Sequence, residues 1–103
     1  MAKKQLIPAP EKLSGEARGI WERVVSGWQL DDAGLVLLGL GLEAHDEMRA
    51  AQEILALDGL VVKDRFGVSR QHPAYLILRD SRNSMLKCLR QLNLDIDSIL
   101  KQE

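Results

Sequence analysis

The sequence has 103 residues, a mass of 11.5 kDa and a net charge of −1, which fit one globular domain with a modest core. Its 46% hydrophobic and 28% charged residues exclude a disordered chain. A single cysteine, Cys88, excludes an intrachain disulfide and a multi-cysteine zinc site. Because no apolar stretch is long enough for a signal peptide or a membrane span, we expect a cytosolic protein.

The first helix is predicted to follow a flexible segment, residues 1–12, which contains Pro8 and Pro10. Ser14 suits the N-cap, and Glu16 in the first turn complements the helix dipole. Gly27 is expected to end the helix between residues 26 and 29. Within this helix, apolar residues recur at spacings of three and four and form one stripe: Ala17, Ile20, Trp21, Val24, Val25 and Trp28.

A long second helix is predicted from Asp31 or Asp32 to about Leu57, with Gly59 as its left-handed C-terminal residue. Residues 35–42 are apolar around the whole circumference, so this part must be covered on all sides. It is either the centre of the monomer or covered on one face by another subunit. Gly39 and Gly41 each cost about 1 kcal/mol in a helix interior, which suggests close approach by another backbone.

A short β-hairpin is predicted next, with strands at residues 60–63 and 68–71 around a turn at residues 64–67. An isolated two-stranded hairpin is marginally stable in water, so it must lean on helices or on a neighbouring chain. Phe66, the only phenylalanine, is the expected anchor.

The third helix is predicted to open at Pro73, to run to about Leu92 and to end at Asn93. A short amphipathic helix over residues 95–100 is expected to follow. The predicted fold is thus mainly α. It is one domain, residues 13–103, with a helical hairpin of the first and the long second helix, a short β-hairpin, a long third helix and a short C-terminal helix.

No catalytic, metal or cofactor site is predicted, because phosphate loops, dinucleotide fingerprints and nucleophile elbows are absent from the sequence. His45, Asp46 and Glu47 are adjacent helical residues that point about 100° apart, so they cannot converge on one ion. Cys88 lies on the apolar stripe of the third helix, which favours core packing over a reactive thiol. We therefore do not expect an enzyme.

The charges divide along the chain. Residues 31–60 carry seven acidic side chains and only Arg49 as a base, whereas residues 61–92 carry seven bases and two acids. The two halves are either solvated faces, or the basic half meets an anion or an acidic surface of a neighbouring subunit. The candidates for contact with DNA phosphates lie on the hairpin and the third helix: Lys63, Arg65, Arg70, Arg79 and Arg82.

The ordered series of motifs resembles one group of phage terminase small subunits. The run from Leu13 to Val25 is similar to their first helix. The other similar pieces follow in the same order over residues 13–97: Leu30-Asp31-Asp32, residues 59–67, His72-Pro73-Ala74, Arg79-Asp80-Ser81-Arg82, residues 86–89, and Leu92-Asn93-Leu94-Asp95. Members often begin with a longer basic arm, of which only Lys3 and Lys4 are present here.

The resemblance implies a non-catalytic role in viral genome packaging in the host cytoplasm. Such subunits recognise viral double-stranded DNA, form oligomers and pass the DNA to a large subunit with ATPase and nuclease activities. We predict an oligomer interface that includes Leu35, Leu38, Leu40, Leu42 and Phe66. The alternatives are an oligomeric adaptor whose acidic and basic halves pair between subunits without DNA, and a small transcriptional regulator. The regulator is disfavoured, because no short turn joins two compact helices.

Overall fold

The computed structural model describes residues 7–94 and contains three helices and one two-stranded antiparallel sheet in that range. In chain order the elements are α1 (Gly15–Gly27), α2 (Asp32–Asp58), β1 (Val61–Lys63), β2 (Ser69–Gln71) and α3 (Ala74–Gln91). The predicted mainly helical order is confirmed over these residues, and the predicted C-terminal helix at 95–100 lies outside them.

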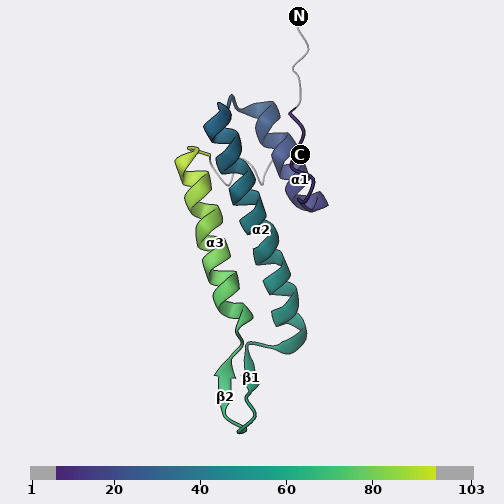
Figure 1. Ribbon diagram of the computed structural model, residues 1–103, viewed down its shortest axis with the longest axis vertical. Helices are drawn as coiled ribbons and strands as arrows, with labels where there is room; N and C mark the ends of the chain where they lie inside the picture. Colours follow the sequence, from purple (N-terminus) through teal and green to yellow (C-terminus); the bar gives the residue numbers. More distant parts are fainter. Residues whose placement is uncertain (1–6, 95–103) are drawn as a thin grey trace, which may run out of the picture.

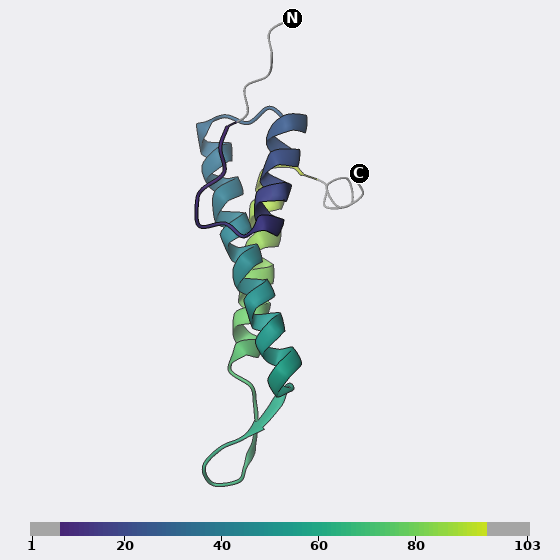
Figure 2. The same ribbon diagram turned by 90° about the vertical axis from the view of Figure 1, so that its right-hand side faces the viewer.

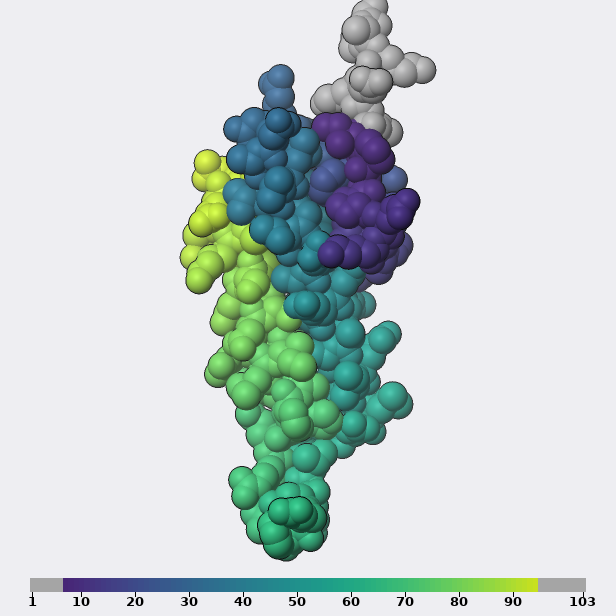
Figure 3. All heavy atoms as spheres, in the orientation of Figure 1, coloured from purple at the N-terminus to yellow at the C-terminus, as the bar shows by residue number. Residues whose placement is uncertain are grey.

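The molecule is elongated, 67 × 24 × 23 Å, because α2 and α3 run antiparallel along its length. In Figure 1, α1 lies beside the first half of α2, and the hairpin projects from the opposite end of the helix pair. The turned view in Figure 2 shows α1 and α2 next to each other with α3 behind them. Figure 3 shows the body narrowing from the three-helix end towards the hairpin.

The helix boundaries follow from local capping. The Ser14 hydroxyl accepts a hydrogen bond from the Ala17 amide at 3.1 Å, and the Asp31 carboxylate accepts one from the Gly34 amide at 2.8 Å. Both residues therefore cap helix N-termini as predicted. Helix α2 ends before Gly59, whose φ of 84° is positive but whose ψ of 165° is extended. The predicted helix end at Gly59 and its positive φ are confirmed, whereas ψ differs from that of a left-handed helical residue, because the chain leaves the helix directly into the extended path of β1.

The end of α3 also follows the prediction. Asn93 has a φ of 57°, in the left-handed region, and its amide donates to the Arg90 carbonyl at 3.0 Å. The Leu94 amide donates to the Leu89 carbonyl at 3.0 Å, which completes a Schellman motif. The motif turns Leu94 back into the core beside Leu89, so the helix terminus also contributes to packing.

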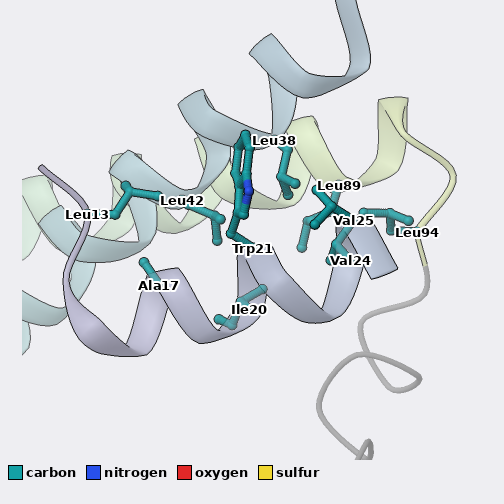
Figure 4. Close-up of a cluster of buried hydrophobic side chains, with 10 residues drawn as sticks. All are labelled: Leu13, Ala17, Ile20, Trp21, Val24, Val25, Leu38, Leu42, Leu89 and Leu94. Carbon is teal, nitrogen blue, oxygen red and sulfur yellow. The ribbon is translucent and has the colours of Figure 1, made fainter. Parts of the chain in front are cut away.

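Most of the core lies at the three-helix end. Helix α1 supplies its apolar stripe, α2 supplies Leu38 and Leu42, and α3 supplies Leu89, as Figure 4 shows. Leu38 is the most deeply placed of these leucines, with 1% of its surface exposed. Near the hairpin the core shrinks to Ala51, Leu55 and Ala74, with Tyr75 and Leu78 partly buried against them. The half of the molecule nearest the hairpin therefore consists only of α2 and α3, packed around Ala51, Leu55 and Ala74, and we call it the stalk.

The described part of the N-terminal segment packs against α1. Trp21 donates its indole N–H to the Ile7 carbonyl at 2.7 Å, and Arg18 donates to the Glu11 carbonyl at 2.9 Å. Leu13 is buried. The flexibility expected of residues 1–12 stays a prediction, and its first six residues lie outside the described range. Among the described residues, no helix is long and apolar enough to cross a membrane.

The two glycines inside α2 differ in how closely a neighbour approaches. A Cβ atom added to Gly41 would lie 3.0 Å from the Cβ of Cys88 on α3, closer than side-chain carbons normally pack. A Cβ added to Gly39 would meet Pro10 and Trp21 only at 3.9 Å, an ordinary contact. The predicted close approach is confirmed for Gly41 and wrong for Gly39.

This difference predicts opposite effects for one substitution at the two positions. Gly41→Ala should destabilise the fold, because overpacking of about 1–3 kcal/mol exceeds the gain in helix propensity. Gly39→Ala should stabilise it by up to about 1 kcal/mol, since alanine fits there. Thermal unfolding of both variants tests this pair. Equal stabilisation by the two substitutions would show that α2 and α3 do not pack closely at Gly41.

Candidate nucleic-acid interface

The hairpin loop is organised around one carboxylate. The Oδ1 atom of Asp64 accepts hydrogen bonds from the amides of Phe66 at 2.8 Å and Val68 at 3.0 Å. Its Oδ2 atom accepts one from the Nε of Arg70 at 2.7 Å. Gly67, with a φ of 79°, supplies the left-handed residue that a three-residue hairpin loop requires. The Arg70 guanidinium and these amides hold the pKa of Asp64 below its ordinary value.

The tip of the loop presents a cation and an aromatic ring to solvent. The guanidinium carbon of Arg65 lies 5.0 Å from the centre of the Phe66 ring, a cation–π distance. Phe66 was expected to anchor the hairpin either to the helices of its own chain or to a neighbouring chain. It is 75% exposed, so it does not pack against the helices of its own chain. Lys63 is exposed at the end of β1. The tip therefore offers two positive charges beside an exposed ring.

His72 joins the base of the hairpin to both long helices. Its Nε2 lies 2.9 Å from the carboxylate of Asp58 at the end of α2. Its Nδ1 accepts a hydrogen bond from the Ala74 amide at the start of α3, at 3.0 Å. Because Nδ1 is the acceptor, the proton is on Nε2 and is donated to Asp58. The His72 amide also donates to the Leu60 carbonyl at 2.8 Å, which closes the hairpin base.

The five sequence-predicted DNA contacts divide into paired and free cations. Arg70 is held by Asp64, and Arg79 lies 3.3 Å from the carboxylate of its neighbour Asp80. The other three, Lys63, Arg65 and Arg82, are exposed and make no ion pair within residues 7–94. The hairpin brings Lys63, Arg65 and Arg70 together, whereas Arg79 and Arg82 lie on α3.

Two further cations of α3 were not among the predicted contacts. Lys87 and Arg90 are exposed, and neither makes an ion pair in the described part of the chain. They lie three residues apart, so they share a face of the helix. This spacing is visible in the sequence, but only the structure shows that no carboxylate neutralises them.

The predicted interface leucines occupy different environments. Leu38 and Leu42 are buried in the core of the single chain, so their side chains do not contribute to its exposed surface. Leu35 is partly buried against the same core, whereas Leu40 is 53% exposed. Val36, which was not predicted, is 63% exposed beside it. The apolar part of α2, residues 35–42, is thus covered by other parts of the chain on only some of its sides.

Polar contacts between α2 and the first turn of α1 hold the start of α1 in place. Asp46 accepts hydrogen bonds from the amide and hydroxyl of Ser14 at 2.8 and 2.6 Å. Glu16 lies 2.8 Å from the Nε2 of the buried His45 and 3.1 Å from the Nε of Arg49. The His45 hydrogen bond holds the pKa of Glu16 below its ordinary value. His45 and Asp46 thus have separate partners on the α1 side and do not converge on one ion.

The comparisons with known proteins give one match. A family described as phage terminase, small subunit, matches residues 17–103, which is most of the chain. No curated protein and no solved structure was found to match it.

The Asp64 network predicts a pH dependence of the hairpin loop. Because the pKa of Asp64 is lowered in the folded chain, its contribution to loop stability is present above the ordinary aspartate pKa. That contribution is lost as the pH falls through the lowered value. NMR shifts of the Phe66 and Val68 amides should therefore titrate with a midpoint below that of an unperturbed aspartate. Asp64→Asn should abolish this transition, and a midpoint at the ordinary value would contradict the network.

Proposed function

The chain belongs to the phage terminase small-subunit family, and on that premise we propose that it is the DNA-recognition subunit of a viral genome-packaging motor. It acts in the host cytoplasm as an oligomer, without catalytic activity of its own. It binds viral double-stranded DNA and presents it to the large subunit, which carries the ATPase and nuclease activities. No metal or cofactor takes part in this role.

The observation that supports DNA binding is the pair of free cations at the exposed hairpin tip. Lys63 and Arg65 have no carboxylate partner in the described chain, so their charges are available to phosphates. The hairpin projects beyond the ends of α2 and α3, as Figure 1 shows. A two-stranded ribbon has a width that the major groove of B-DNA admits. The tip can therefore reach a duplex without the helices blocking the approach.

A second set of cations lies on α3. Arg82 is exposed and makes no ion pair within residues 7–94, and it is the α3 residue that we assign to phosphate contact. Arg79 forms an ion pair with Asp80, and the negative charge of that carboxylate weakens the attraction of Arg79 for a phosphate. Arg70 is assigned a positioning role, because its guanidinium holds the carboxylate that shapes the loop carrying Arg65. Substitution of Arg70 would disturb the loop and would not report on a phosphate contact alone.

An oligomer is needed for useful affinity. The chain carries a net charge of −1, so one copy offers only a few phosphate contacts against a neutral background. The electrostatic contribution to DNA binding grows with the number of phosphates neutralised. Several copies bound to one duplex would therefore multiply the contribution of each tip.

An assembly adaptor that does not bind DNA is the second candidate. Two of the predicted cations, Arg70 and Arg79, are already paired within the chain, which lowers the charge available to DNA. In this case Lys63 and Arg65 would lie in a contact with another protein subunit. Their loss would then change the mass of the assembly and not its affinity for DNA.

Binding of double-stranded DNA at several salt concentrations tests the proposal. The double variant Lys63→Ala, Arg65→Ala should bind more weakly, and the slope of log affinity against log salt should fall by about 1.8 if each cation contacts one phosphate. Lys12→Ala is the control, because it removes an exposed cation near α1 that is paired with Glu43. Its salt slope should equal that of the wild type.

Light scattering on the same variants separates the two candidates. DNA recognition predicts that the double variant keeps the wild-type mass while its affinity falls. The adaptor predicts a smaller assembly with unchanged weak DNA affinity. A double variant with wild-type mass and a wild-type salt slope would contradict both assignments of the hairpin tip.

A further inference from the structure

Phe66 is an exposed apolar group that the proposed phosphate contacts leave unexplained. It is the only phenylalanine of the chain, and 75% of its surface is exposed. It lies in the loop between β1 and β2, beyond the end of the stalk, and no other element of residues 7–94 lies beside this loop in Figures 1 and 2. Because exposure of an aromatic ring to water is unfavourable, a ring in this position favours contact with a partner.

The backbone that carries the ring is fixed by the loop itself. The Phe66 amide donates to Oδ1 of Asp64 at 2.8 Å, and the Gly67 amide donates to the Asp64 carbonyl at 2.9 Å. The Asp64 amide in turn donates to the Val68 carbonyl at 2.9 Å, which extends the pairing of the strands into the loop. None of these hydrogen bonds uses the side chain of Phe66. The loop therefore presents the ring without needing it for its own structure, and a partner does not have to order the backbone first.

The charges around the ring suit an anionic partner. Residues 60–71 carry three basic side chains and one acidic side chain. The acidic one, Asp64, is already bound to the guanidinium of Arg70 and to two amides. Lys63 and Arg65, on either side of it in the sequence, are exposed and make no ion pair among the described residues. An apolar protein surface would have to desolvate both cations, whereas a DNA duplex offers them phosphates on both sides of a groove.

The part of a duplex that this ring can contact is the floor of the major groove. The major groove is wide enough to admit a two-stranded ribbon, and the apolar group that it displays is the C5-methyl of thymine. Phosphates border the groove, so Lys63 and Arg65 can contact them while the tip points inwards. Phenylalanine has no side-chain hydrogen-bond donor or acceptor. Apolar contact with a methyl group is therefore the way in which Phe66 can distinguish one base from another.

Insertion of the ring between two base pairs suits this geometry less well. An aromatic ring that intercalates stacks both of its faces on bases. The guanidinium of Arg65 lies over the Phe66 ring, 5.0 Å from its centre, so a charged group already occupies one face. Burial of that charge within the base stack would be unfavourable. The other face and the edge of the ring stay open, and contact with a methyl group requires no more than these.

We propose that Phe66 contacts the C5-methyl groups of thymines in the major groove and thereby gives the hairpin tip a preference for sites that contain thymine. This inference rests on the proposed function, because it requires the hairpin to bind double-stranded DNA. Lys63 and Arg65 supply the affinity that does not depend on sequence, and Phe66 supplies a part that does. In an oligomer each tip adds one such contact, so the preference of a single tip is multiplied along the duplex.

A duplex without the methyl group tests the contact. The probe is a mixed-sequence duplex in two forms, which differ only in that deoxyuridine replaces thymidine throughout, so every phosphate and every base pair is kept. The full chain should bind the thymidine form more tightly, by about fourfold for each tip that buries a methyl group. Phe66→Ala should bind the two forms equally. Phe66→Leu, which keeps a large apolar side chain, should retain part of the preference.

Two controls separate the contact from other effects. Val36→Ala shortens another exposed apolar side chain, near the start of α2 and at the opposite end of the molecule from the hairpin, so it should keep the wild-type preference. Phe66→Ala removes no charge and no backbone hydrogen bond of the loop, so its slope of log affinity against log salt should equal that of the wild type. A lower slope would mean that the ring only positions Arg65, which would overturn the methyl contact.

Other results would overturn the proposal as well. Equal affinity of the wild type for both forms would do so, as would a Phe66→Ala variant that keeps the preference. A smaller assembly for Phe66→Ala in light scattering would assign the ring to a contact between subunits. Bending of the duplex that depends on Phe66, without a methyl preference, would assign the ring to a base step.

Failure of the proposed function gives a different result. The wild type would then bind neither form of the duplex, and the methyl contact would be excluded with it. By contrast, equal binding of both forms that still depends on Lys63 and Arg65 would exclude the methyl contact and leave DNA recognition by the hairpin tip in place.

Discussion

The close packing of α2 against α3 is the contact on which the other parts of the molecule depend. At Gly41 the absence of a side chain lets Cys88 approach so closely that an added Cβ atom would lie 3.0 Å from the Cys88 Cβ, and one of the two helices would have to shift. Because the antiparallel hairpin between them reverses the chain, the two helices lie antiparallel along the molecule. The end of α2 and the start of α3 lie side by side, so β1 and β2 can pair and project beyond the two helices. At the other end the pair forms a surface on which α1 builds the main core.

Polar contacts position the elements that this helix pair does not cover. Asp46 and His45 connect α2 to the start of α1, and His72 connects the hairpin to the ends of both long helices. Asp64 then shapes the loop that carries Arg65. Many acidic groups thus have partners inside the chain, while Lys63, Arg65 and Arg82 make no ion pair among the residues that the structure describes. The excess of positive charge over residues 61–92 comes from their composition of seven basic and two acidic side chains, and the pairing decides which of the basic side chains have a carboxylate beside them.

The sequence predicted best those features that depend on a few adjacent residues. The caps at Ser14 and Asp31 and the end of α3 at Asn93 are confirmed, because each depends on hydrogen bonds within one turn. The candidate interface was harder to predict. Arg70 is paired with Asp64 because the hairpin brings the two side chains together. The sequence pattern alone could not distinguish such a paired cation from a free one.

The sequence by itself determined the helical order, the hairpin and the absence of any recognisable catalytic pattern, since these are properties of local spacing. Only the tertiary structure decided which sides of α2 are covered. Leu38 is buried and Leu40 exposed because α1 and α3 occupy part of the circumference of α2. It also decided which cations have a carboxylate partner and which apolar side chains of α2 and α3 remain exposed. These outcomes depend on contacts between segments far apart in the chain, and local propensity contains no information about them.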